Sequence, residues 1–135
     1  MTATIHYQGN LRCNATHIQS GTGMETDAPT DNRGKGERFS PTDLVCTALG
    51  TCMITTMAMK AMDMGIELKG TAVEVKKYMA ASPRRIAKID VLLTYPAALV
   101  LSETDYEILK TTGDNCPVMK SIHPDIEVKA EYRRK

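Results

Sequence analysis

A long, largely uncharged segment that follows Phe39 limits the folds open to this chain more than any other feature. Ser40, Pro41 and Asp43 together form a helix start, with serine at the N-cap, proline at N1 and an acidic residue at N3. Apolar residues then occur on every side of the expected helix until Gly65, rather than along one stripe. A helix of this kind must be covered on most sides. The sequence therefore predicts a buried central helix, and a chain of only 135 residues needs a partner chain to cover it.

The uncharged part of this segment does not read as a membrane span. It runs from Leu44 to Met59 and contains four threonines and a glycine, whereas a spanning helix needs roughly 20 mostly apolar residues. The N-terminus has no basic region followed by an apolar run, so no signal peptide is readable. We therefore expect a cytoplasmic protein with no membrane partner, in which the four cysteines are free or redox-active thiols.

The charges are nearly balanced and spread along the chain. There are 17 basic and 16 acidic residues, and the formal net charge is +1. Nucleic-acid binding needs a basic face or stripe. We therefore expect no nucleic-acid partner.

The remaining patterns predict strands, helices and then a strand, which is the α+β class. We expect two strands within residues 3–18 around a turn at Gly9 and Asn10, and a polar loop over residues 19–39 with a short strand near Met24. Alternating apolar residues predict an antiparallel pair over residues 71–78 and 89–95. Two helices are expected at residues 102–113 and 117–122, followed by a last strand over residues 126–132.

Cys116 stands directly before Pro117, so it falls at or next to the N-cap of the short helix. The helix dipole and the free amide groups at such a position favour a thiolate over a thiol, and a thiolate is the reactive form. A cysteine that merely caps a short helix is the competing interpretation.

Cys52 lies deep within the central helix, where the dipole has little effect and burial favours the neutral thiol. On this pattern alone, a core residue is the more frequent interpretation. A reactive Cys52 would need a cation from another segment. Arg33 and Arg38, in the loop before the helix, are the candidate suppliers, although each is also explained as a solvated loop arginine.

The other cysteines do not form a second site in the sequence. Cys46 precedes Cys52 by a spacing that puts the two about 120° apart around the helix, so they do not share a face. Cys13 and His17 have the spacing of half a metal site, but no second pair accompanies them. We therefore expect no bound metal.

Two segments resemble the OsmC/Ohr family of cysteine-based hydroperoxide reductases. Residues 39–52, Phe-Ser-Pro-Thr-Asp-Leu-Val-Cys-Thr-Ala-Leu-Gly-Thr-Cys, are similar to the family's central-helix signature, and residues 115–118, Asn-Cys-Pro-Val, are similar to its second signature. The order of the other elements also fits, so we expect a single domain over residues 1–135. The resemblance implies antiparallel sheets wrapped around a long central helix, in an intertwined homodimer with active sites at the interface.

The resemblance also implies a chemistry. Cys52 would be the thiolate that attacks an organic or fatty-acid hydroperoxide, and Cys116 would resolve the resulting sulfenic acid as a disulfide. An external dithiol of the lipoyl type would reduce that disulfide, and no bound cofactor is expected.

One position departs from the family pattern. Typical members carry Glu directly after the helix-opening proline, hydrogen-bonded to the activating arginine, and this chain has Thr42 there. Asp43 and Glu37 are the candidate acids, but Asp43 is rotated by about 100° around the helix and already has a role as a capping residue. Two alternatives therefore remain: a non-peroxidatic member that binds a small molecule or senses redox state, and a structural domain with inert cysteines.

Overall fold

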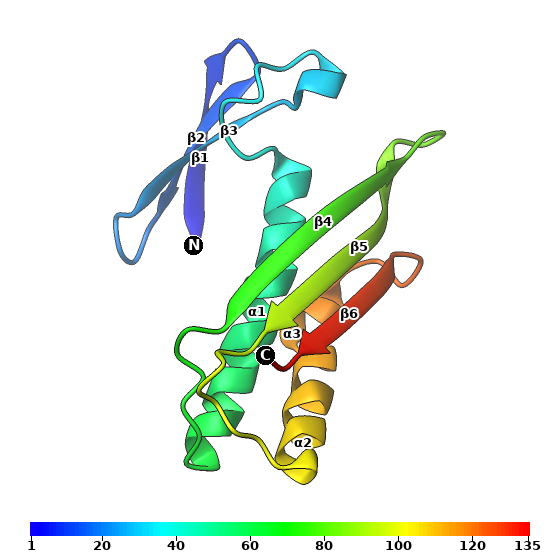
Figure 1. Ribbon diagram of the computed structural model, residues 1–135. Coiled ribbons are helices and arrows are strands. Elements are labelled where there is room, and N and C mark those ends of the chain that lie inside the picture. Colours follow the sequence, from blue (N-terminus) through cyan, green and yellow to red (C-terminus); the bar gives the residue numbers. More distant parts are fainter. The chain divides into compact units, whose positions relative to one another are not determined.

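The computed structural model describes all 135 residues, which form two compact units, Met1–Val45 and Cys46–Lys135. Three strands and a short 3-10 turn precede the long helix α1, which begins in the first unit and continues through the second (Figure 1). The elements are β1 (Ala3–Gly9), β2 (Arg12–His17), β3 (Gly23–Asp27), η1 (Thr30–Asn32), α1 (Pro41–Asp63), β4 (Ala72–Ala80), β5 (Arg85–Thr94), α2 (Glu103–Asp114), α3 (Pro117–Ser121) and β6 (Glu127–Arg133). This is the predicted α+β class.

The first unit is built on an antiparallel sheet in the order β1-β2-β3. Asn10 and Leu11 connect β1 to β2 with positive φ angles of 52° and 64°, which suits a tight hairpin turn. The predicted hairpin and the short strand near Met24 are both confirmed. A partly buried ion pair joins β2 to β3, since Arg12 contacts the buried Asp27 through two hydrogen bonds of 2.7 and 2.9 Å.

Helix α1 has the ends that the sequence predicted. At its start, Ser40 Oγ accepts a hydrogen bond from the Asp43 amide (3.1 Å), and Asp43 Oδ2 accepts one from the Ser40 amide (2.9 Å). This reciprocal pair satisfies two amides that have no partner within the helix. At its end, Gly65 takes a left-handed φ of 72°, and the Ile66 amide bonds back to the Ala61 carbonyl.

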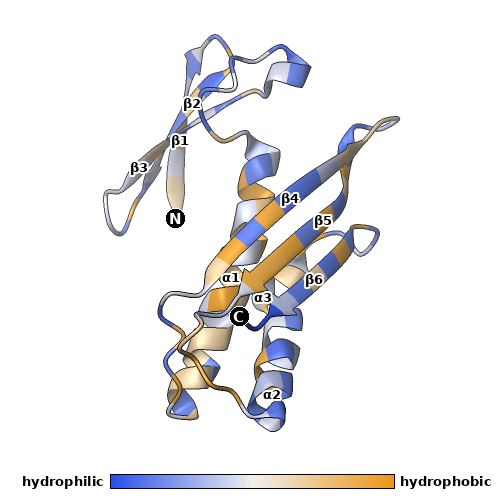
Figure 2. Ribbon diagram, in the orientation of Figure 1, coloured by the Kyte–Doolittle hydropathy of each residue, from blue (hydrophilic) through white to orange (hydrophobic).

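The core of the second unit lies between the sheet formed by β4, β5 and β6 and the helices on one of its faces (Figure 1). Alternation along β5 puts three fully buried side chains on that face, Ile89, Val91 and Leu93. They belong to one core with the buried side chains of α1, which are Cys46, Leu49, Met53, Met57 and Ala61, and with Leu109 of α2. Figure 2 shows the corresponding alternation of hydrophobic and hydrophilic bands along the strands.

The pairing within this sheet is mixed. β4 and β5 are antiparallel, as the alternating patterns predicted, whereas β6 runs parallel to β5. A parallel neighbour needs a long connection, and the segment that contains α2 and α3 provides it. Alternation within single strands carries no information on this direction.

By length and composition alone, α1 would also pass as a membrane-spanning helix. In this structure its buried residues belong to the core with β5 and α2. Its opposite side carries the exposed residues Ala48, Thr51, Thr55, Met59 and Met62, none of which is charged.

Candidate functional site

The second unit brings Cys52 and Cys116 together although they are far apart in the sequence. Cys52 lies in the middle of α1 and is partly exposed, while Cys116 is the N-cap residue of α3 and is fully buried. The Cys52 side chain lies near enough to Cys116 to raise the pKa of its thiol, and both cysteines are free thiols. The Cys52 sulfur also lies 3.9 Å from Thr56 Oγ1, one turn further along α1. Two sulfurs in such contact can form a disulfide after a small local movement.

Cys116 occupies the helix position that the sequence predicted, but its electrostatics differ from the expectation. Burial raises the pKa of the Cys116 thiol, and the neighbouring Cys52 raises it further. The backbone amides of Met119 and Val118, at the start of α3, act in the opposite direction. Burial outweighs the helix start, so the net pKa is raised and the neutral thiol is favoured.

A tyrosine from the last strand holds the turn that precedes Cys116. The Tyr132 hydroxyl donates a hydrogen bond of 2.7 Å to Asp114 Oδ1, and the backbone carbonyl of Tyr132 accepts one of 2.8 Å from the Tyr106 hydroxyl. Burial, followed by the contact with Asp114, raises the pKa of Tyr132 far above its usual range. The sequence analysis missed Tyr132 and Asp114, because a strand tyrosine and a turn aspartate have ordinary local explanations.

The candidate arginines belong to the first unit, whereas both thiols belong to the second. Arg33 follows the 3-10 turn with a left-handed φ of 69°. Arg38 donates a hydrogen bond of 3.0 Å to the backbone carbonyl of Glu37, and its Nε lies 3.7 Å from the Glu25 carboxylate.

The candidate acids each have a partner within the first unit. Glu37 lies 3.4 Å from Arg12 Nη2, and Asp43 completes the capping box of α1. The hydroxyl of Thr42, at the position of the family's glutamate, lies 3.2 Å from Ser40 Oγ. Arg12 was not among the predicted residues, because the sequence does not show that it meets the buried Asp27.

The two remaining cysteines lie on β2 and near the start of α1. Cys13 is on β2, opposite Tyr7 of β1, and Cys46 is buried on the core side of α1. No group of three or more His, Cys, Asp or Glu side chains is arranged to hold a metal ion.

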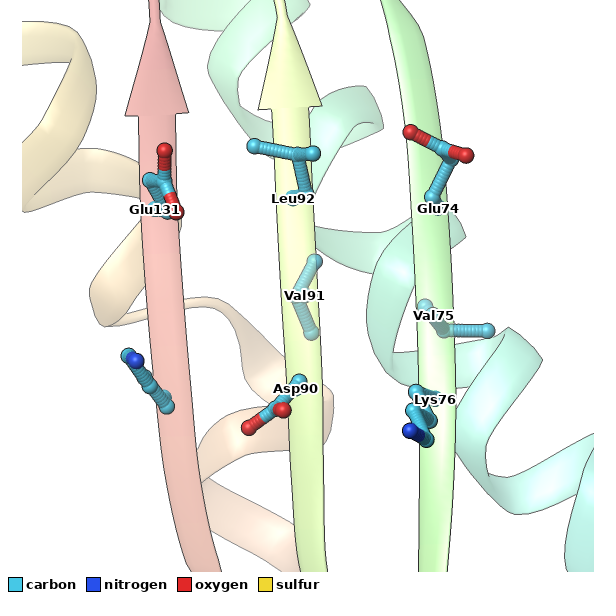
Figure 3. Close-up of a pocket in the computed structure, with 8 residues that line it drawn as sticks. Glu74, Val75, Lys76, Asp90, Val91, Leu92 and Glu131 are labelled. Carbon is cyan, nitrogen blue, oxygen red and sulfur yellow. The ribbon is translucent and has the colours of Figure 1, made fainter.

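A hollow of about 450 Å³ lies on the second sheet and has a largely charged lining (Figure 3). It is lined by Glu74, Val75, Lys76, Asp90, Val91, Leu92, Lys129 and Glu131. Beside it, the Tyr78 hydroxyl donates a hydrogen bond of 2.9 Å to Asp90 Oδ2. Its lining includes no cysteine or methionine.

Together, the mixed α+β fold and its long core helix define a protein of the OsmC/Ohr type. The sequence model described as OsmC-like protein matches residues 34–131, and the chain belongs to this family. The family includes organic hydroperoxide resistance proteins.

Three solved structures illustrate the similarity. A protein of Psychrobacter arcticus 273-4, named for osmotic stress induction and a detoxification response, is 47% identical, with a TM-score of 0.94 over 98% of this chain and 96% of that one. An organic hydroperoxide resistance protein OsmC of Legionella pneumophila is 16% identical, with a TM-score of 0.76 over 97% and 94%. An organic hydroperoxide resistance protein of Elizabethkingia anophelis is 14% identical, with a TM-score of 0.77 over 100% and 97%. No curated protein matches the chain.

Proposed function

We propose that this protein is a thiol-dependent peroxidase that reduces organic and fatty-acid hydroperoxides. The observation that supports it best is the contact between a partly exposed thiol, Cys52, and a buried one, Cys116, within one compact unit. A partly exposed sulfur can meet a substrate, whereas a buried neighbour is available mainly to that sulfur. Membership of a family that includes organic hydroperoxide resistance proteins supports the same function.

The proposed cycle has three steps. The Cys52 thiolate attacks the terminal peroxide oxygen, the O–O bond breaks, and the alkoxide takes up a proton to leave as an alcohol. The Cys116 thiol then attacks the sulfur of the Cys52 sulfenic acid, and its proton leaves with the hydroxide as water. An external dithiol of the lipoyl type reduces the resulting disulfide by thiol–disulfide exchange and becomes a cyclic disulfide.

The first step needs a positive charge near Cys52, both to hold the thiolate and to stabilise the leaving oxygen. We propose that Arg33 or Arg38 supplies this charge. Of the candidate acids, Glu37 is paired with Arg12 and Asp43 bonds Ser40. We propose that Glu37 or Asp43 orients the arginine in addition to making these contacts.

We further propose that the protein acts as a homodimer in the cytoplasm. The uncharged exposed side of α1 includes Met59 and Met62, which are 57% and 75% exposed. In the first unit, Ile5 and Tyr7 of β1 are 68% and 65% exposed on one face of the sheet. Large apolar side chains that are exposed together on one face are typical of surfaces that a partner covers. Four free cysteines agree with a reducing compartment.

A second candidate function is a non-peroxidatic member that binds a small molecule or senses redox state through the same thiols. The observation that favours it is Thr42, which supplies a hydroxyl bonded to Ser40 where peroxidase members have a carboxylate. Such a protein would form the Cys52–Cys116 disulfide slowly with hydroperoxides.

The experiment that separates these candidates is turnover of cumene hydroperoxide with dihydrolipoamide, for the wild type, Cys52→Ser and Cys116→Ser. The peroxidase proposal predicts that both replacements abolish turnover, and that mass spectrometry of the oxidised wild type finds a Cys52–Cys116 disulfide. Cys13→Ser is the matched control and should keep full activity. An unchanged thiol content after a stoichiometric pulse of hydroperoxide would contradict the proposal and favour the second candidate.

A further inference from the structure

The connection between α2 and α3 is very short, and it carries Cys116. Helix α2 ends at Asp114, Asn115 caps it, and Cys116 already caps α3. The Cys116 amide donates to the Gly113 carbonyl (3.3 Å), and the Cys116 carbonyl accepts from the Lys120 amide (3.2 Å). With so few residues in between, any displacement of Asp114 is transmitted to the Cys116 sulfur.

Tyr132 of β6 reaches across to this connection from another part of the fold. Its side chain is 7% exposed, and its hydroxyl donates to Asp114 Oδ1 over 2.7 Å. The hydroxyl lies close to Gly113. A Cβ atom at Gly113 would be 2.6 Å from this hydroxyl and 2.8 Å from Met57 Sδ. The glycine thus leaves the space in which the hydroxyl meets Asp114, and Met57 of α1 borders the same space.

We propose that Tyr132 is a positioning residue for Cys116. Its hydrogen bond to Asp114 keeps the Cys116 sulfur at the distance and orientation from Cys52 that disulfide formation needs. The proposal deepens the function proposed above and rests on it. The step that it concerns is disulfide closure: the S–S bond forms, the S–O bond of the Cys52 sulfenic acid breaks, and the Cys116 proton leaves with the hydroxide as water.

Disulfide formation has strict geometric requirements, which is why the hydrogen bond between Tyr132 and Asp114 should matter. Disulfide formation brings two neighbouring sulfurs to about 2.05 Å from each other, with a restricted torsion angle between them. A sulfur on a loosely held turn spends less time in that arrangement, and the rate falls in proportion. Loss of one hydrogen bond to a carboxylate changes the equilibrium between the held and the released turn by roughly tenfold to 150-fold. Since only part of this loss reaches the sulfur, we expect closure to slow by about threefold to tenfold.

The central test is Tyr132→Phe, which removes only the hydroxyl oxygen. In single-turnover experiments with cumene hydroperoxide, we expect sulfenic acid formation at Cys52 to stay within about twofold of the wild type, while closure slows by about threefold to tenfold. Dimedone, which traps sulfenic acids, should then capture a larger fraction of the protein. A change confined to the second step separates positioning from a general loss of structure, which would slow both.

The chain offers a matched control and a rescue. Tyr78→Phe removes the same kind of bond, the hydroxyl of Tyr78 to Asp90, at a site beside the charged hollow, and it should leave both steps unchanged. Asp114→Asn keeps an oxygen acceptor for Tyr132 and should close nearly as fast as the wild type. Asp114→Ala removes the acceptor and should resemble Tyr132→Phe, and the double variant should be no slower than either alone.

A second measurement tests the role of the Tyr132–Asp114 hydrogen bond without any peroxide. Equilibration with glutathione converts the two thiols and oxidised glutathione into the protein disulfide and two reduced glutathiones. Tyr132→Phe should slow the formation of the protein disulfide in this reaction. The equilibrium constant should not rise. Wild-type closure rates in both Tyr132→Phe and Asp114→Ala, by either oxidant, would overturn the proposal. If the wild type forms no sulfenic acid with hydroperoxides, the proposed function fails, and the glutathione rates still decide the role of Tyr132. If Tyr132→Phe does not fold, Asp114→Ala gives the same comparison.

Discussion

Gly50 of α1 faces Val75 of β4 so closely that a Cβ atom at position 50 would lie 2.8 Å from Val75 Cγ1. Val73 Cγ1 would be 3.3 Å away, so the strand crosses the helix at the glycine. This crossing predicts that Gly50→Ala destabilises the protein. Alanine improves helix propensity by about 1 kcal/mol, but overpacking costs about 1–3 kcal/mol. We therefore expect a net loss of up to about 2 kcal/mol in the free energy of unfolding, measured with urea.

The control for this effect lies two residues earlier. Ala48 is exposed on the same helix, so Ala48→Gly should cost about 1 kcal/mol through helix propensity alone. Alanine would then stabilise the helix at position 48 and destabilise the protein at position 50. Equal or greater stability of Gly50→Ala would contradict the close packing of α1 on β4.

The ion pair between Arg12 and the buried Asp27 predicts a pH dependence of stability. The Arg12 guanidinium, hydrogen-bonded to Asp27, holds the pKa of that carboxyl below its usual range. Because the pKa of Asp27 is lowered in the folded state, the ion pair contributes its full stability above the ordinary aspartate range, near pH 4. This contribution is lost as the pH falls further towards the folded-state pKa of Asp27. Urea unfolding at a series of acid pH values measures this loss.

Arg12→Gln should lower stability at neutral pH and reduce the acid sensitivity, because the buried carboxylate loses its charged partner. Arg134→Gln is the matched control, since Arg134 pairs with the exposed Glu103 and the loss of an exposed ion pair should change stability little. Equal effects of the two replacements would argue against a structural role for the pair in the first unit.

The proposed activating arginine predicts a change in the reactivity of Cys52. Replacing the arginine that supplies the charge, by Arg33→Ala or Arg38→Ala, should move the pH–rate curve for Cys52 alkylation to higher pH, because the thiolate loses a cation. Alkylation of Cys52 can be followed peptide by peptide with mass spectrometry. Arg12→Gln provides the comparison for a loss of charge elsewhere in the first unit. If neither Arg33→Ala nor Arg38→Ala shifts the curve, the loop does not activate the thiol.

The proposed homodimer predicts that a charge on the exposed side of α1 weakens association. Met59→Glu places a carboxylate beside the exposed Met62, and burying this carboxylate unpaired costs several kcal/mol. Sedimentation velocity should then find monomer at concentrations where the wild type is dimeric. Lys60→Gln, at the neighbouring exposed position, should leave association unchanged. A monomeric wild type would refute the homodimer directly.

The contact between the thiols predicts how Cys116 titrates. Cys52 raises the pKa of Cys116, so Cys52→Ser should lower that pKa, although burial will still hold it above an ordinary thiol. The Cβ chemical shift of Cys116 against pH measures the change by NMR. Cys13→Ser should not move it. A pKa that rises or stays constant in Cys52→Ser would mean that the two sulfurs do not interact in solution.

Much of the fold was predictable because its signals are local. The reciprocal bonds of Ser40 and Asp43, and the left-handed glycine that ends α1, each depend on residues within a few positions of one another. The same holds for Ser102, whose side chain accepts the Asp105 amide at the start of α2. Strand alternation is equally local, since each side chain alternates faces with its neighbours. The parallel direction of β6 was not predictable in this way, because it depends on the crossover that precedes it.

In the candidate site, too, the local features were predictable from the sequence and the long-range contacts were not. The sequence by itself determined that Cys116 would cap a short helix and that Cys52 would lie within a long one, because caps and periodicity act over a few residues. Only the tertiary structure decided that the two sulfurs meet, that burial outweighs the helix start at Cys116, and that Tyr132 reaches Asp114. These three facts depend on the packing of α1, α3 and β6, whose distant segments are brought together by the burial of apolar surface, and no local pattern specifies which side chains then come into contact.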